Sequence, residues 1–280
     1  MTQQIVMLGA AATIVLTMLM PQPEEKVVFL DVGQGDAILL QDSTTQVLID
    51  GGQGMAVLQR LGEEIPWFDR KIEVVILTHP QRDHMEGLLH VLERYEVGLV
   101  LLPRVTHTSQ LQETWLQMIQ DRNIPYRFAW TGQKLTAGDM MFQILGPFNT
   151  DAARAASKAD LNNASVMTRV DFHKMSFLLT GDAEKRVETM LVSNTNPNLL
   201  DVDILKAGHH GSNSSTHEQL IRAASPHAAV ISVGTENKFG HPREEVLNRL
   251  GSIPIWRTDY SGSVRFIYDG KQWLAATSKS

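Results

Sequence analysis

Histidine and aspartate residues cluster at four places where an apolar run of sequence ends. Asp50 ends the run QVLID, the segment His79–His84 (HPQRDH) follows VVILT, Asp182 follows FLLTG, and His209–His210 follow DILKAG. Any one of them is an ordinary cap or turn residue, because Asp caps helices well and Gly-Asp is a common turn. Four clusters at four strand ends indicate a shared site, since loops at strand ends are held by a rigid scaffold.

These residue types suit a divalent cation. Asp83 and His84 follow His79 at a tight turn, and His with Asp favours a borderline ion such as zinc or manganese. Asp182 ends an apolar strand, where an isolated carboxylate is costly to desolvate unless a cation lies nearby. The chain has no cysteine, which excludes zinc fingers, iron–sulfur clusters, disulfides and a cysteine nucleophile. Ten histidines are available as ligands instead.

The elements that position these residues alternate between strands and helices. Continuous apolar strands between helices predict an α/β fold in which a sheet is covered on its faces. We expect strands within 27–40, at 46–50, 73–78, 97–102, 165–172, 175–180, 203–206, 228–233, 263–268 and 272–275, short strands within 126–145, an exposed loop or short helix at 151–160, and helices at 55–64, 84–95, 110–122, from about 183, 218–224 and 243–250.

Length and composition limit the classes of protein to which this chain can belong. The chain has 280 residues, of which 43% are apolar and 20% charged, so it can bury the core of a large single α/β domain. This composition excludes a disordered or fibrous chain. The formal charge of −6 excludes a basic nucleic-acid packager. It does not exclude a nuclease, because a bound metal and a local basic patch can hold phosphate on an acidic protein.

The N-terminal segment Ile5–Met20 is uncharged and predominantly apolar. Its length favours a membrane anchor or an uncleaved signal, and a cleaved signal or a buried helix remains an alternative. Residues 1–25 are therefore expected to form a hydrophobic anchor or signal with its linker, and residues 26–280 to form one domain outside the cytoplasm.

The motifs carry a family resemblance. HPQRDH resembles the metallo-β-lactamase signature His-x-His-x-Asp-His, and a helix and Gly87 are expected to follow. More narrowly, FLDVGQGDAILL, LIDGG, THPQRDHMEG, LLTGDA, LKAGHHGSNSS and FGHP resemble the metallo-β-lactamase-like domain of the ComEC competence proteins, over about residues 26–275. ComEC proteins bring transforming DNA across the bacterial inner membrane. The resemblance implies a four-layer αββα sandwich with its site at the rim between two sheets, so that residues 26–280 would be a hydrolase domain.

The resemblance implies a first metal site that is incomplete in this chain. His79 matches the first histidine of the signature. Gln81 stands where the second histidine belongs, and a neutral amide is a poor substitute for imidazole. The third histidine is expected near 162–165, where the chain reads NNAS. Such a site would depend on water and substrate oxygens.

The resemblance implies that the second metal site is complete. Asp83 and His84 are present, and Asp182 would be shared between the two sites. The remaining nitrogen comes from His209, His210 or His241, with His210 or His209 favoured. We therefore expect one or two divalent ions, Mn(II) or Zn(II), with the metal ligands drawn from His79, Asp83, His84, Asp182, His209 and His210.

Metal-assisted hydrolysis is the chemistry that this resemblance implies. An aspartate would orient water and a histidine would protonate the leaving oxygen. The candidate catalytic residues are Asp83, His209, His210 and His241. Candidate phosphate contacts are Asp36, in a glycine turn, with Ser212 and Asn213 before a predicted helix. Lys206, Arg82, Lys238 and Arg243 are available for a phosphodiester backbone.

The favoured function is a phosphodiesterase or nuclease acting on DNA, expected to be single-stranded, during competence-related uptake. With at most one predicted span, the chain would work beside a separate membrane channel. Two alternatives stay open. One is a non-catalytic DNA-binding or assembly module with a depleted metal site, and the other is a hydrolase of small esters, lactones or phosphodiesters.

Overall fold

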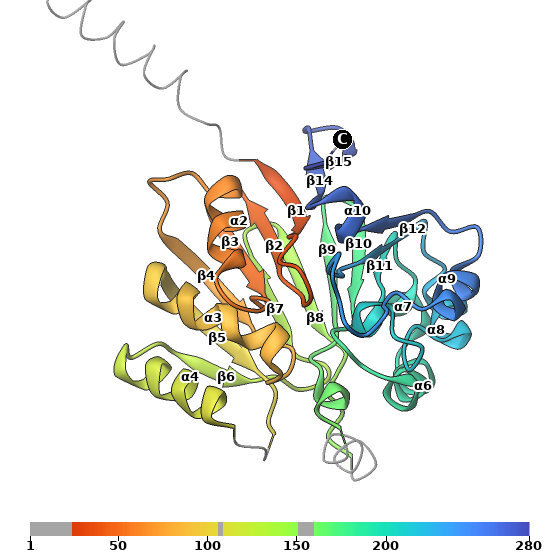
Figure 1. Cartoon of the computed structure of the whole chain (residues 1–280), viewed down its shortest axis with the longest axis horizontal. Coiled ribbons are helices and arrows are strands. Elements are labelled where there is room, and N and C mark those ends of the chain that lie inside the picture. The colour runs from red at the N-terminus through yellow and green to blue at the C-terminus, as the bar shows by residue number, and fades with distance from the viewer. Residues whose placement is uncertain (1–23, 106–108, 151–159, 280) are drawn as a thin grey trace, which may run out of the picture.

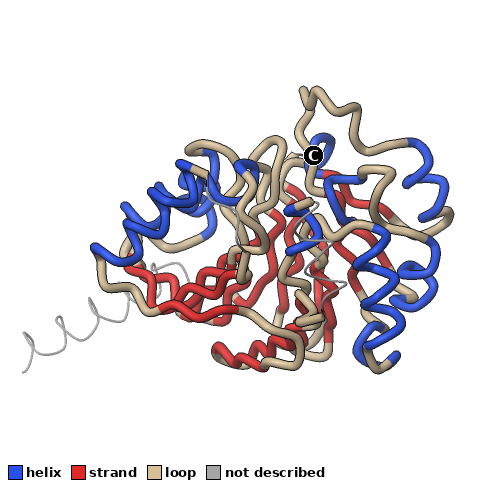
Figure 2. The backbone as a smooth tube through the Cα atoms, turned by 90° about the horizontal axis from the view of Figure 1, so that it is seen from below, coloured by secondary structure: helices blue, strands red, loops and turns tan. Residues whose placement is uncertain are grey.

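The computed structural model describes residues 24–105, 109–150 and 160–279. Two β-sheets stack face to face, and helices cover the outer face of each (Figures 1 and 2). This arrangement confirms the predicted four-layer αββα fold. The segment Ile5–Met20 lies outside the described residues, so its role as an anchor or signal stays a prediction. Within the described ranges, no helix is both long and apolar enough to cross a membrane.

The first sheet has eight strands in the order β15-β14-β1-β2-β3-β4-β5-β6. Its strands β3 to β6 run parallel, so their carboxyl ends lie at one rim. The strands are β1 (Glu25–Phe29), β2 (Ile38–Asp42), β3 (Thr45–Ile49), β4 (Lys71–Ile76), β5 (Glu96–Leu102), β6 (Tyr126–Phe128), β14 (Val264–Tyr268) and β15 (Trp273–Thr277).

The second sheet has seven strands in the order β13-β12-β11-β10-β9-β8-β7. Strands β10 to β13 run parallel, which again brings their carboxyl ends together. The strands are β7 (Lys134–Ala137), β8 (Met140–Ile144), β9 (Thr168–Phe172), β10 (Met175–Leu179), β11 (Ile204–Lys206), β12 (Ala228–Ile231) and β13 (Ile255–Arg257).

The helices are amphipathic and bury their apolar sides against the sheets. Those over the first sheet are α2 (Ala56–Glu64), α3 (Arg82–Arg94) and α4 (Gln110–Asp121). Those over the second are α6 (Lys185–Asn194), α7 (Pro197–Leu200), α8 (Glu218–Ala224) and α9 (Glu244–Leu250). Three short turns complete the described elements: η1 (Leu161–Ala164), η2 (Gly208–Gly211) and α10 (Thr258–Ser261).

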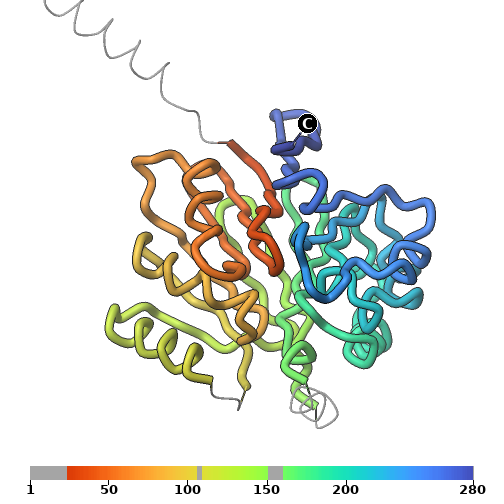
Figure 3. The backbone as a smooth tube through the Cα atoms, viewed as in Figure 1, coloured from red at the N-terminus to blue at the C-terminus, as the bar shows by residue number. Residues whose placement is uncertain are grey.

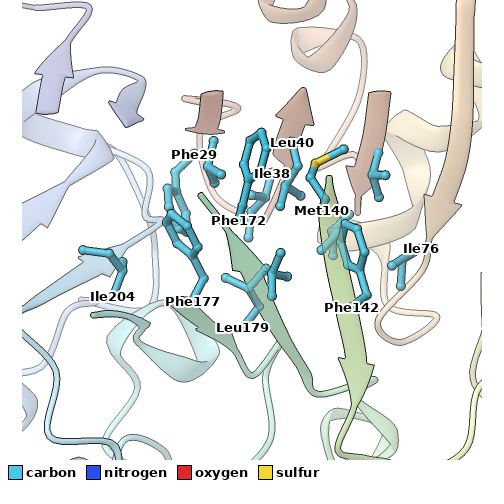
Figure 4. Packing of buried hydrophobic residues seen from close by; sticks show 14 of the residues in the cluster. Phe29, Ile38, Leu40, Ile76, Met140, Phe142, Phe172, Phe177, Leu179 and Ile204 are labelled. Carbon is cyan, nitrogen blue, oxygen red and sulfur yellow. The ribbon is translucent and has the colours of Figure 1, made fainter. Parts of the chain in front are cut away.

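The strands alternate between two apolar layers. Along β1, Val27 and Phe29 lie between the sheets, whereas Val28 lies under the helices. Phe29 and Phe177 come from opposite sheets and belong to the same buried cluster, which Figure 4 shows from close by. Strands buried on both faces explain why the sequence shows continuous apolar runs rather than alternation.

The chain builds the first sheet, then the second, and finally returns to the first (Figure 3). The last hairpin, β14 and β15, joins the edge of β1, with Phe266 opposite Val27. Most expected strands and helices are present within a few residues. The strand expected at 165–172 begins only at Thr168, because the backbone N–H of Val166 donates to Thr78 O of the other sheet. Residues 151–159 of the expected loop lie outside the described residues.

Candidate metal centre

The four clusters meet at the rim between the two sheets. Asp50 directly follows β3 and His79 follows β4, both at carboxyl ends of parallel strands of the first sheet. Asp182 follows β10, and His209 and His210 follow β11, at the corresponding ends of the second sheet. The parallel strands thus deliver chemistry-bearing side chains from both halves of the chain to one place.

Glycines in the quoted motifs allow the loops to pack closely enough. A Cβ atom on Gly87 of α3 would lie 1.9 Å from Gly51 O, so only glycine lets the LIDGG loop meet this helix. A Cβ on Gly35, whose φ is +132°, would lie 2.1 Å from Asp83 O. The N–H of Gly51 donates to His84 O at 2.7 Å. These contacts fix the first turn of α3, which carries Asp83 and His84, against the end of β3.

Asp182 lies at the middle of the centre. Its Oδ2 atom is 3.3 Å from His84 Nε2 and 3.3 Å from His210 Nε2. The same His210 Nε2 is 3.3 Å from Asp83 Oδ2. Asp182 is held in place by Ser165, whose Oγ accepts from the Asp182 N–H at 3.0 Å and donates to Asn162 O at 2.7 Å.

Two imidazoles have their Nδ1 atoms engaged by acceptors. His84 Nδ1 lies 2.7 Å from Asp50 Oδ2, and His210 Nδ1 lies 3.0 Å from the carbonyl oxygen of Ser232. Because a carbonyl or an ionised carboxylate only accepts, each Nδ1 carries a proton. When the rings are neutral, their Nε2 lone pairs therefore face Asp182. A partner behind each ligand that fixes the tautomer is the usual support of a metal site.

His79 is oriented in the same way through Thr78. The Thr78 hydroxyl donates to Asp50 Oδ2 at 2.6 Å, so it can only accept from His79 Nδ1, 3.0 Å away. Burial and the neighbouring His84 lower the pKa of His79 to about 3. His79 is therefore a neutral imidazole at pH 7 whose Nε2 is unprotonated.

The buried polar atoms of the centre fit a cation. Among the described side chains, the Nε2 atoms of His79, His84 and His210 and both carboxylate oxygens of Asp182 are buried without a hydrogen-bond partner. Such atoms are costly to leave unpaired. Among the groups that offer three ligand atoms within 4.8 Å of one another are His79 with His84 and Asp182, and Asp83 with His84 and His210. A donor set of imidazoles and carboxylates suits a divalent ion.

When no ion is bound, protons supply part of the positive charge that compensates the carboxylates. Burial opposes the charge on His84 and His210, but Asp182 outweighs it and raises the pKa of both imidazoles well above the usual range. Burial likewise opposes the charge on Asp182, yet these two histidines hold its pKa well below the ordinary value. The centre is thus built around positive charge, which a metal ion or bound protons can supply.

Curated relatives match almost the whole length of the chain. No protein-family model matches the chain. ComE operon protein 3 of Bacillus subtilis is 31% identical over 292 residues, which cover 96% of this chain and 37% of the relative. Recombination protein 2 of Haemophilus influenzae is 32% identical over 263 residues, covering 90% of this chain and 30% of the relative. The chain thus spans about a third of the length of these curated relatives.

A solved structure shares the fold. The metallo-β-lactamase fold protein YhfI from Bacillus subtilis superposes with a TM-score of 0.57 at 13% identity, covering 86% of this chain and 99% of YhfI. The chain contains a ComEC-type metallo-β-lactamase-like domain. In this ComEC-type domain, His210 links Asp83 to Asp182, and His84 lies against the same oxygen of Asp182.

The choice between His209 and His210 follows from the backbone of η2. Both residues have positive φ, 50° and 54°, which is uncommon for side chains other than glycine and concentrates at functional sites. His210 is buried in the centre, whereas His209 is partly exposed and its Nε2 lies 3.9 Å from Asp182 Oδ2. His209 Nδ1 is 3.2 Å from Ser214 Oγ. His210 is therefore the candidate ligand, and His209 lies at the open side.

His241 lies beside His209 on the same open side. The two ring centroids are 5.7 Å apart, and Phe239 stacks on His241 at 5.6 Å. Asn237 accepts from the His241 N–H and donates to its carbonyl, both at 2.8 Å. Burial lowers the pKa of His241 to about 4, and the neighbouring histidines add to the effect. His241 is thus neutral at pH 7 in the metal-free protein.

Two residues that were predicted to contact substrate, Asp36 and Lys206, are buried. Asp36 is ion-paired with Lys206, and both side chains are shielded from solvent. Burial would raise the pKa of Asp36, but Lys206 holds it at about 2. In this structure Asp36 and Lys206 instead face each other inside the protein and help to neutralise the centre, and their contact with substrate stays a prediction. The Lys206 ammonium also donates to Gly181 O at 3.1 Å.

The segment 211–215 precedes α8 rather than opening it. The Asn213 carbonyl and side-chain oxygens both accept from Arg249, so Asn213 is engaged by α9. Ser212 Oγ lies 3.0 Å from Ser214 Oγ, which in turn contacts His209. Ser214 is thus the serine of this segment that contacts the centre. Gln81 precedes α3, where its backbone carbonyl accepts from His84 N at 3.1 Å.

Sequence reasoning missed the supporting residues. Thr78, Ser165 and Lys206 position the candidate ligands without contacting an ion themselves. Thr78 and Lys206 stand inside the quoted motifs THPQRDHMEG and LKAGHHGSNSS, adjacent to or near the histidines. The position of Thr78 directly before His79 is a local signal for its role, whereas the supporting role of Lys206 depends on its pairing with Asp36.

Proposed function

We propose that this domain is a metal-dependent hydrolase that cleaves phosphodiester bonds of single-stranded DNA during competence-related DNA uptake. The observation that supports it is the convergence of His84 Nε2, His210 Nε2 and the Asp83 and Asp182 carboxylates at the open rim between the sheets. The names of the two relatives, which refer to the ComE operon and to recombination, support DNA as the substrate class.

The role of each residue in the proposed reaction follows from its position in the site. Asp83, His84, Asp182 and His210 would hold one divalent ion, Mn(II) or Zn(II), and His79 would reach a second beside Asp182. A divalent ion bound there supplies a Lewis acid that polarises a phosphoryl oxygen and lowers the pKa of water.

His209 and His241 lie outside this ligand group and face the open side. Neutral His241 can accept a proton or donate a hydrogen bond to a substrate oxygen. His209, hydrogen-bonded through Nδ1 to Ser214, can present Nε2 to a leaving oxygen within reach of Asp182.

Cleavage of a fluorescently labelled oligonucleotide tests this proposal. The wild-type protein, stripped with chelator and reloaded with Mn²⁺ or Zn²⁺, should cut the strand, and chelator should stop it. Asp83→Ala and His84→Ala should lower the rate at least about 100-fold, since each removes a ligand from a shared ion. His227→Ala is the matched control, because His227 is 81% exposed and contacts only Asp203 among the described residues.

Absence of cleavage with every divalent ion, together with retained DNA binding, would instead identify a non-catalytic binding module. Hydrolysis of a lactone but not of bis-p-nitrophenyl phosphate would contradict the phosphodiesterase assignment. The proposal also places the domain outside the cytoplasm, beside a separate membrane channel. Protease accessibility of the domain in intact spheroplasts checks that placement, and protection from protease would contradict it.

A further inference from the structure

The free margin of the first sheet exposes three aromatic side chains in five residues. Tyr126, Phe128 and Trp130 are 46%, 41% and 51% exposed, respectively. Single exposed aromatics are ordinary on protein surfaces, but a contiguous group marks an interaction site. We call Arg104 together with residues 126–130 the β6 margin; Figure 1 shows β6 beside α4 at the outer side of the sheet.

Two of the three aromatic rings of the β6 margin contact each other. Tyr126 and Phe128 lie on the same face of β6 and meet edge to face, with ring centroids 6.0 Å apart. The Arg104 guanidinium carbon lies 5.7 Å from the Phe128 ring centroid, within the range of a cation–π contact. Rings supported by such contacts offer π-faces at low entropic cost, as a base-stacking surface requires.

Positive charge accompanies the rings on an otherwise acidic protein. The segment 122–134 (RNIPYRFAWTGQK) contains Arg122, Arg127 and Lys134 and no acidic residue, although the chain carries a net charge of −6. Arg104 and Arg127 are exposed, and neither forms an ion pair with any residue of the described ranges. Arg104, which contacts the Phe128 ring, is complementary to a phosphate backbone beside accessible bases, whereas Arg127 alternates with Tyr126 and Phe128 along β6 and points to the other face of the sheet.

The register of the parallel strands places this margin on the rim that carries the metal centre. Ile76 pairs with Leu101, and Leu102 pairs with Phe128. Phe128 ends β6, and His79 follows the end of β4, so both lie at the carboxyl-terminal rim of the parallel strands. Neighbouring strands are about 4.8 Å apart, so β6 lies roughly 10 Å from β4. That span corresponds to about three nucleotides of a stacked strand at about 3.4 Å each.

We propose that the β6 margin binds single-stranded DNA by base stacking and leads it along the rim to the metal centre. The choice of DNA rests on the proposed function. Single strands are favoured over duplex because a duplex keeps its bases stacked on one another and cannot offer them to Phe128 and Trp130.

Fluorescence anisotropy with labelled oligo-dT and a matched duplex, in chelator so that no strand is cut, tests the margin. Phe128→Ala/Trp130→Ala should weaken binding of the single strand at least about tenfold and leave duplex binding within twofold. Phe128→Tyr/Trp130→Phe, which keeps the rings, should restore it. Trp67→Ala/Phe68→Ala is the matched control, because this exposed aromatic pair precedes β4, at the opposite end of the sheet.

A second variant tests the charges. Arg104→Gln should reduce the slope of log affinity against log salt by about 0.7, the contribution of one phosphate contact on a single strand, and Arg127→Gln, on the opposite face of β6, is the matched control that should leave the slope unchanged. Hydrolysis of bis-p-nitrophenyl phosphate, which is too small to span the margin, should be unchanged in every variant.

These experiments distinguish a failure of the proposed stacking surface from a failure of the proposed catalytic function. Unchanged single-strand binding in Phe128→Ala/Trp130→Ala, or an equal loss in the Trp67 control pair, would overturn the stacking surface while hydrolysis of the small substrate continued. Binding lost as expected, with no hydrolysis by the wild-type protein, would leave the margin standing and refute the catalytic function. Binding restored to Phe128→Ala/Trp130→Ala by folding at lower temperature would point to a structural role of the rings and also overturn the inference.

Discussion

The ammonium nitrogen of Lys206 lies 2.5 Å from Oδ2 of Asp36, and neither side chain is more than 2% exposed. The same nitrogen lies 3.6 Å from Asp182 Oδ1. Burial opposes the charge of the lysine, but Asp36 outweighs it and raises the pKa of Lys206 above its ordinary value. A permanent positive charge therefore stands behind the candidate metal ligands, on the side away from the open rim.

Lys206→Met should destabilise the protein by about 3–5 kcal/mol, because it leaves Asp36 as an uncompensated buried charge. Lys206→Met/Asp36→Leu should recover most of that loss, since removal of both partners is often close to neutral. Chemical unfolding of the metal-free proteins measures both values. Lys71→Met, which removes a half-exposed partner of Glu73, is the control and should change stability by less than about 1 kcal/mol. A single variant as stable as wild type would show that Asp36 is not charged.

Asp50→Asn should weaken metal binding about 10- to 100-fold without removing a ligand. Asp50 accepts from the Thr78 N–H at 2.7 Å and lies 2.7 Å from His84 Nδ1, so it fixes the ring that presents Nε2 to Asp182. Competition titration with a fluorescent chelator gives the affinity. Asp121→Asn, at the exposed end of α4, should leave it unchanged. Equal affinities of Asp50→Asn and wild type would mean that Asp50 does not orient the ligand.

His210→Ala and His209→Ala should differ in kind. Because His210 Nε2 lies 3.3 Å from both Asp83 and Asp182, its loss should abolish tight metal binding. Because His209 lies at the open side and contacts Ser214, its loss should preserve the metal affinity and reduce the turnover of oligonucleotide. Calorimetric titration with Zn²⁺ separates binding from turnover. The opposite pattern would make His209 the ligand.

Metal binding should strengthen as the pH rises. His84 and His210 have pKa values raised well above normal without metal, and both must lose their protons to bind an ion. Up to two protons should be released for each ion that binds. For each proton that the ion must displace, the apparent affinity should change about tenfold per pH unit. Calorimetry in buffers of different ionisation enthalpy counts the protons. A pH-independent affinity would mean that these imidazoles are neutral before the ion arrives.

The same groups set the pH dependence of the metal-free fold. In the folded protein, the pKa values of His84 and His210 are higher than in the unfolded chain. Protonation of these two residues therefore contributes its full stabilisation below about pH 6.5, and this contribution is lost as the pH rises through the folded-state pKa values. The lowered pKa of Asp182 stabilises it above about pH 3.9 and is lost as the pH falls through the folded value. The lowered pKa values of His79 and His241 act in the opposite sense and remove stability as the pH falls below about 6.5, so metal-free protein should be most stable near that pH, which thermal unfolding across pH measures. A stability that rises steadily above pH 7 would contradict this assignment.

The sequence predicts the layers of this fold well because both sheets are buried on two faces. Apolar runs such as VVILT and FLLT have no other stable placement, and glycine and polar residues mark their ends. It fails at β13, because Ile255–Arg257 is a half-buried edge strand of three residues with too little apolar sequence to stand out.

The centre is predictable in its residue types but not in its geometry. The clusters at Asp83, His84 and Asp182 follow from strand ends. Selection of His210 over His209 depends on two consecutive left-handed backbone conformations, which no local pattern prescribes. A lysine after an apolar run is ordinarily exposed, so the burial of Lys206 becomes apparent only once Asp36 arrives from the other sheet.

The candidate ligands are divided between the sheets: His79, Asp83 and His84 belong to the first, and Asp182 and His210 to the second. An ion coordinated by both would act as a cross-link between the two layers, in addition to their apolar contacts and the buried Lys206–Asp36 pair. At a free concentration 1,000 times its dissociation constant, such an ion would add about 4 kcal/mol to the folded state. Metal supply would then govern how long the molecule survives heat and proteases as well as whether it is active, and neither half of the polypeptide expressed alone could retain the ion.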